Sequence, residues 1–105
     1  MEKESFYKKI PRMNVAEKIK LAILGSKEAR DILLKDSNKI VSFAVLKNPR
    51  ITEDEIIKLV NSRSLSDEII RQVANNREWV KKYPVKLGLV TNPKTPLPLS
   101  LKLLN

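Results

Sequence analysis

The sequence predicts an all-α protein, a short right-handed α-solenoid built from about four degenerate helix pairs. Three observations lead to this prediction. Only two of the 105 residues are glycine, and the apolar residues recur at spacings of three and four, which is the period of a helix face. Helix start signals recur along the chain, and four segments end in a similar way. A compact multi-helix bundle is the alternative, because bundle helices share the same ending chemistry.

Capping residues place the helix starts. Asn14 with Glu17, and Thr52 with Glu55, have the spacing of a capping box, in which the cap and the third helical residue satisfy each other's backbone amides. Further starts are expected at residues that either cap a helix or stand before a proline that fits its first turn. These are Ser26, Ser37, Ser66, Tyr83 and Thr95.

Four segments share one inward-facing pattern and one kind of ending. Apolar columns four residues apart begin at Ile19, Val41, Ile69 and Val85, and continue at Ile23, Val45, Val73 and Leu89. A third column follows at once, at Leu24, Leu46, Ala74 and Val90. Each segment then breaks at a small polar residue, namely Ser26, Asn48, Asn76 or Asn92. The resulting helix pairs are expected to stack, because one pair cannot bury its apolar face alone, and they cover residues 14–34, 37–61, 66–83 and 84–104.

The domain prediction is a flexible leader at residues 1–13 followed by a single helical-repeat domain at residues 14–105. The leader contains six charged residues and no apolar run, which is unlike a secretory signal peptide. No stretch approaches the roughly 20 apolar residues of a membrane span. The chain has no cysteine, which fits a reducing compartment. We therefore expect a soluble, cytoplasmic protein.

The composition argues against most enzyme mechanisms. The chain has no histidine and no cysteine, which removes thiol nucleophiles, the usual zinc ligand sets and imidazole bases. Acidic residues group at 53–55 and 67–68, within the first turns of expected helices, where the helix dipole already accounts for them. The expectation is a protein that is not an enzyme and has no cofactor or metal.

Two motifs carry a family resemblance. AVLKNP at residues 44–49 and LVTNP at residues 89–93 place an aliphatic turn before an asparagine–proline pair. The chain thereby resembles the bacterial HEAT-like and leucine-rich-repeat-variant class of short helical repeats. It is also similar, through NREW at 76–79 and NPKTP at 92–96, to a bacterial helical-repeat family without an assigned activity. The resemblance implies a helical repeat over residues 14–104 and no catalytic residue. The first and third copies depart from it, with Lys27 and Arg77 in place of proline.

Leucine-rich-repeat-variant proteins can carry an iron–sulfur cluster on a cysteine-rich segment. This chain lacks any cysteine, so the resemblance implies no such cofactor here.

Positive charge is concentrated near the C-terminus. The formal net charge is +9, and residues 79–105 contain five lysines and no acidic residue. A basic surface of this kind can meet nucleic acid, an anionic membrane or an acidic protein face, or can simply be solvated. Trp79 lies among these cations and is expected either to pack in the core or to contact a partner. The candidate partner-binding residues are Arg71, Arg77, Trp79, Lys81, Lys82, Lys86 and Lys94.

The expected function is that of a non-enzymatic interaction module, because repeat stacks present broad surfaces to another protein or an extended peptide. The alternative is a nucleic-acid-binding module that uses the basic C-terminal patch. The apolar ending Leu103-Leu104-Asn105 also leaves a homo-oligomer open, since terminal repeats usually need a polar cap.

Overall fold

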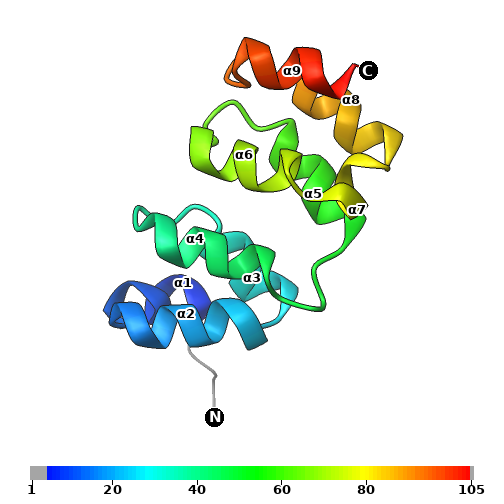
Figure 1. The fold of residues 1–105 in the computed structure, drawn as a ribbon. Coiled ribbons are helices and arrows are strands. Elements are labelled where there is room, and N and C mark those ends of the chain that lie inside the picture. Colours follow the sequence, from blue (N-terminus) through cyan, green and yellow to red (C-terminus); the bar gives the residue numbers. More distant parts are fainter. Residues whose placement is uncertain (1–4, 105) are drawn as a thin grey trace. The chain divides into compact units, whose positions relative to one another are not determined.

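The computed structural model describes residues 5–104 and confirms the all-α fold class (Figure 1). Within these residues there are nine α-helices, one 3-10 helix and no strand. The chain has two compact units, Met1–Ile51 (unit 1) and Thr52–Asn105 (unit 2). None of the helices in the described part is both long and apolar enough to cross a membrane.

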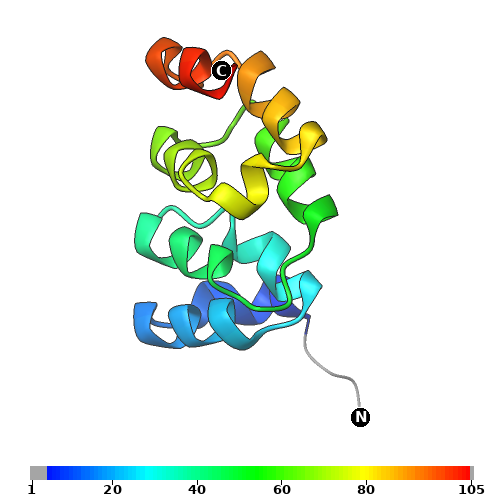
Figure 2. The ribbon, with the colours of Figure 1, turned by 45° about the vertical axis from the view of Figure 1, so that its right-hand side comes forward.

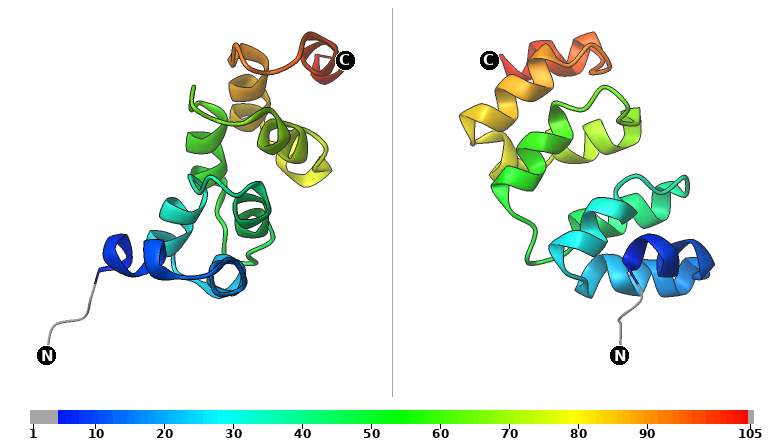
Figure 3. Two further views of the ribbon diagram at one scale, coloured as in Figure 1. Left: turned by 90° about the vertical axis from the view of Figure 1, so that its left-hand side faces the viewer. Right: turned by 180° about the vertical axis from the view of Figure 1, so that it is seen from behind.

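Unit 1 has a buried core to which η1, α2, α3 and α4 contribute. Its described elements are α1 (Phe6–Lys9), η1 (Ile10–Arg12), α2 (Val15–Leu24), α3 (Lys27–Leu33) and α4 (Lys39–Leu46). The helices α2 and α4 lie side by side (Figure 2), and α1 lies beside α3 (Figure 3). The buried cluster consists of Ile10, Ala22, Ala29, Leu33, Val41, Ala44 and Val45.

Residues 6–13 correct the prediction of a flexible leader. The hydroxyl of Ser5 accepts a hydrogen bond from the amide of Tyr7 (3.1 Å) and so caps α1. Ile10 is buried in the core cluster of unit 1, with Phe6 and Met13 packed against the same cluster. These apolar residues follow helical spacing, and Pro11 does not interrupt it, because proline is tolerated in the first turn of η1. Residues 1–4 of the expected leader lie outside the described residues.

Unit 2 contains α5 (Glu53–Val60), α6 (Asp67–Ala74), α7 (Arg77–Val80), α8 (Tyr83–Thr91) and α9 (Leu97–Leu103). The helices α5 and α8 lie side by side (Figure 2). Gly88 on α8 makes this close approach possible: a Cβ atom there would collide with Cγ2 of Val60 and would stand 3.3 Å from Oδ1 of Asn61.

Most predicted helix starts are confirmed. Both halves of the Asn14–Glu17 capping box form, at 2.8 and 3.2 Å. Thr52 and Ser66 each accept the expected backbone hydrogen bond. Three starts are shifted by one residue: Asn38 rather than Ser37 caps α4, Lys82 rather than Tyr83 is the cap of α8, and Pro96 is the cap of α9 rather than its first helical residue.

In chain order the predicted helix pairs contain α2–α3, α4–α5, α6–α7 and α8–α9, but the second pair is divided between the two units, because α4 belongs to unit 1 and α5 to unit 2. The first two apolar columns are buried on α4, α6 and α8 and partly buried on α2. The third column does not hold throughout, because Leu24 is exposed.

The four polar corners fall into two classes, which corrects the expectation of four equivalent endings. Ser26 and Asn76 are exposed and cap the short helices α3 and α7 directly. Asn48 and Asn92 are buried, and each is followed by a turn of four residues before the next helix. The two buried corners are those followed by proline, which does not allow the preceding helix to continue through the asparagine.

Candidate interaction surface

The seven predicted partner-binding residues all lie in unit 2. Arg71 is on α6, Arg77 and Trp79 are on α7, and Lys86 is on α8. Lys81 and Lys82 occupy the turn between α7 and α8. Lys94 lies between α8 and α9. The charged residues among them are exposed, apart from the partly buried Lys86.

Two of these cations are paired with carboxylates. Nζ of Lys81 lies 3.4 Å from Oε1 of Glu78, and Nζ of Lys82 lies 3.9 Å from Oε1 of Glu53. Both pairs are solvent-exposed, so they contribute little to stability, but they reduce the local positive potential. Lys86, Lys94 and Lys102 have no ion-pair partner among residues 5–104.

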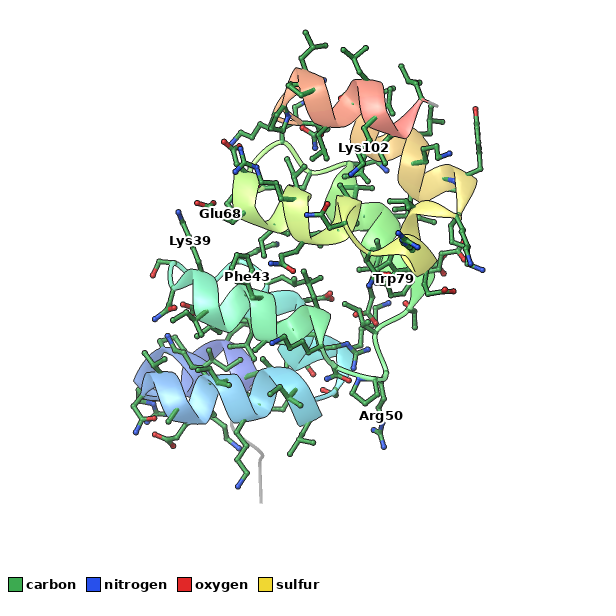
Figure 4. The ribbon with its side chains drawn as sticks, viewed as in Figure 1. Lys39, Phe43, Arg50, Glu68, Trp79 and Lys102 are labelled. Carbon is green, nitrogen blue, oxygen red and sulfur yellow. The ribbon has the colours of Figure 1, made fainter. Side chains whose placement is uncertain are left out.

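Trp79 is partly buried on α7 (Figure 4). Its backbone amide donates to Oδ1 of Asn76 (3.2 Å), as does the amide of Glu78 (3.0 Å). The asparagine cap thus fixes the start of the short helix that positions the indole. The side chain of Trp79 is neither fully buried nor fully exposed, so its position allows both core packing and contact with a partner.

The clearest surface feature of unit 2 was not among the predicted site residues. Leu97, Leu101 and Leu104 are exposed by 69%, 55% and 65%, and they follow one another at spacings of four and three. They therefore lie on one face of α9 and its C-terminal cap, which we call the α9 leucine face. The spacing was visible in the sequence. The sequence prediction used only the apolar ending Leu103-Leu104 and so did not include this face.

The opposite side of α9 is also apolar. Leu103 is buried, and Leu99 is partly buried. The helix α5 of the same unit differs, because it exposes Asp54 and Lys58 whereas its leucine and isoleucines are largely buried. A helix with apolar residues on more than one side normally has protein on more than one side. α9 thus buries one apolar side and presents a second one to solvent.

A smaller apolar stripe occurs on α8. Tyr83 and Leu87, four residues apart, are exposed by 71% and 46%. Lys86 lies next to this stripe in the sequence of α8 and is partly buried. Unit 2 therefore combines exposed apolar side chains and lysines on two successive helices.

Two carboxylate residues, Glu55 and Asp36, take part in local structural contacts. Glu55 is buried at the start of α5, where its amide donates to the hydroxyl of Thr52 (3.3 Å). In unit 1, Oδ2 of Asp36 pairs with Nζ of Lys18 (2.9 Å), and Oδ1 accepts from the amide of Asn38 (2.8 Å). Burial raises the pKa of Asp36, but the hydrogen bonds from Lys18 and Asn38 and the charge of Lys18 bring this pKa below its ordinary value.

The described residues therefore offer surfaces for binding, and they contain no group of three or more histidine, cysteine, aspartate or glutamate side chains placed to hold a metal ion. The apolar face of α9 and the lysines of unit 2 are the features that a partner could recognise. Comparisons of the chain with protein-family models, with curated proteins and with solved structures found no match.

Proposed function

We propose that the protein is a non-enzymatic interaction module that binds another protein or an extended peptide through unit 2. The observation that supports this most is the α9 leucine face, with three leucines each more than half exposed. Monomeric proteins rarely leave such a row of large apolar side chains in water unless it is used for contact. Binding another chain would remove this area from water.

The helical repeat is part of the same proposal. Asn48 and Asn92 occupy equivalent buried corners, as copies of one repeat would. Stacking of the helix pairs into a right-handed solenoid of the HEAT-like and leucine-rich-repeat-variant kind would give a rigid support for the contact surface. A cytoplasmic location fits the lack of cysteine.

A nucleic-acid-binding module is the second candidate. It is favoured by one observation: Lys86, Lys94 and Lys102 belong to a stretch of 27 residues without a carboxylate side chain, and none has an ion-pair partner among the described residues. Phosphates would supply the missing negative charge. The α9 leucine face favours a protein or peptide partner, because a phosphate backbone does not bury leucine side chains.

Affinity capture from extracts of the native cell, with and without nuclease, tests the proposal. Protein partners that remain after nuclease treatment, and that are retained as salt rises from about 50 to 200 mM, are the expected result. A second arm measures binding to a random-sequence duplex over the same salt range. Loss of all captured material with nuclease, together with duplex affinity that falls steeply with salt, would contradict the first candidate and establish the second.

A further inference from the structure

We propose that the α9 leucine face is the docking site for an acidic amphipathic helix. This inference rests on the proposed function and extends it, because it names the surface and the chemistry of the partner. Three observations lead to it: the spacing of the leucines, the second apolar side of α9, and the charge of the surrounding chain.

The spacing of the exposed leucines matches helix recognition. Leu97, Leu101 and Leu104 stand at positions i, i+4 and i+7, so they cover two turns, or about 10 Å of helix. Partner helices are read through anchors at the same spacing on their own apolar side. A second helix laid along α9 would interdigitate its apolar side chains with these leucines.

The partner would complete a layer that unit 2 begins. Leu103 is buried on the inward side of α9 and fixes the helix in place. Contacts of α9 with α6 and α8 hold this inward side. The outward leucines are consequently held by the fold before any partner arrives, which lowers the entropy lost on binding.

The charge of the region selects an acidic partner. Lys94 stands three residues before Leu97, in the turn that leads into α9, whereas Lys102 (Figure 4) lies on a side of α9 away from the outward leucines. Both are exposed, neither has an ion-pair partner among the described residues, and no side chain of residues 79–105 is acidic. Aspartate or glutamate beside the apolar stripe of a partner would meet Lys94 and a stretch of chain without a carboxylate side chain.

The same charges argue against a second copy of this chain. Two copies meeting through the α9 leucine face would bring together two carboxylate-free segments, each with Lys94 next to the face. Docking α9 on another part of a second copy would also bring positive charges together. Residues 5–51 carry eleven basic and four acidic side chains, and residues 52–105 carry nine basic and six acidic side chains. Like charges on both sides of an interface oppose association.

An anionic membrane surface would also attract these lysines. Helices that lie in a membrane interface usually present a larger apolar face together with a distinct charged face. α9 has only seven residues, and leucines occupy both of its sides. A partner helix suits this short face better than a lipid surface does.

The test uses the full chain as bait for an unbiased displayed-peptide library. A Leu97→Gln/Leu101→Gln variant removes two of the outward leucines and keeps residues that favour helix. Leu24→Gln is the matched control, because Leu24 is 67% exposed and lies in unit 1. Unchanged thermal unfolding of both variants establishes that the fold is kept. Vesicles with and without phosphatidylglycerol form a separate arm.

The expected result is enrichment of peptides that carry Asp or Glu beside apolar residues spaced by three and four. Their affinity should fall about tenfold or more in the double variant and stay unchanged in Leu24→Gln. Peptides that bind the wild type and the double variant equally would overturn this inference and leave the proposed function standing. A library without any enriched peptide would contradict both. Vesicle binding that needs Leu97 and Leu101, without enriched acidic peptides, would assign the face to a membrane instead.

Discussion

Asn48 and Asn92, which stand 44 residues apart, make the same set of hydrogen bonds. The side-chain amide of Asn48 donates to the carbonyls of Ala22 (3.0 Å) and Gly25 (3.1 Å), at the end of α2. That of Asn92 donates to the carbonyls of Val60 (2.8 Å) and Ser62 (3.0 Å), at the end of α5. In both, Oδ1 accepts from the amide two residues on. One asparagine thus joins α4 to α2, and the other joins α8 to α5.

Replacing either asparagine by alanine should destabilise the unit that contains it. Asn92→Ala leaves two carbonyls of the α5 end without their donors, so the free energy of unfolding should fall by about 2 kcal/mol. Asn48→Ala should have a similar effect. Asn75→Ala is the control, because Asn75 is exposed and should change stability by less than about 0.5 kcal/mol. Urea denaturation of the three variants measures this. Equal effects at positions 75 and 92 would show that the buried corners have no special role.

Thr95→Val should stabilise the protein. Thr95 stands three residues after Asn92, as Ile51 stands three residues after Asn48, and both amides donate back to the asparagine carbonyl (3.0 and 3.1 Å). Thr95 is buried, and its hydroxyl has no hydrogen-bond partner among the described residues. Valine keeps the shape and removes the unsatisfied group, so the midpoint of urea unfolding should rise, by about 1 kcal/mol in free energy.

Thr91→Val is the control for this change. Thr91 is exposed, and its hydroxyl donates to the carbonyl of Leu87 (2.8 Å). The same substitution there should leave stability unchanged or slightly lower. A destabilising Thr95→Val would mean that the hydroxyl has a partner in solution, such as a bound water.

Gly88→Ala should lower stability although alanine favours helix by about 1 kcal/mol. The added Cβ collides with Cγ2 of Val60, and overpacking of this kind typically costs about 1–3 kcal/mol. Chemical denaturation in two backgrounds separates the causes. In a Val60→Ala background the same change should be neutral or favourable, because the colliding methyl groups are gone. An equal loss of stability in both backgrounds would show that the collision with Val60 is not its cause.

Stability should depend on pH through Asp36. Its folded-state pKa lies below the unfolded one, because the bonds to Lys18 and Asn38 outweigh burial. The stabilisation is therefore present above the unfolded pKa, about 4, and is lost as the pH falls through the folded value. As the pH is lowered from about 5, the free energy of unfolding of Asp36→Asn should fall less than that of the wild type. Thermal unfolding over this range measures the difference, and parallel curves for the two proteins would contradict the assignment.

The sequence predicted most of the local structure. Capping residues such as Asn14, Thr52 and Ser66 place helix starts because their side chains act on their own backbone, within three residues. Helix spacing likewise predicted which faces of α4 and α8 are buried. The asparagine–proline corners were also recognised, although Ser26 and Asn76 were wrongly grouped with them.

What could not be predicted depends on residues far apart in the chain. The partners of Asn48 and Asn92 lie 23 to 32 residues before them, and nothing local specifies them. The burial of Ile10 was missed because it depends on helices that come later in the chain and share the same core. For the site, Arg71 and Trp79 were chosen by residue type. The spacing of Leu97, Leu101 and Leu104 was visible in the sequence, but the burial of Leu103, which decides which side of α9 faces solvent, was not.

Site-specific photo-crosslinking in the native cell tests the interaction role most directly. A photoreactive amino acid replaces Leu101 in one variant and Leu24 in another, and adducts are identified by mass spectrometry. The account predicts a defined protein adduct at position 101, resistant to nuclease, and none at position 24. No adduct at position 101, or the same set of adducts at both positions, would contradict the claim that the outward leucines of α9 receive a partner.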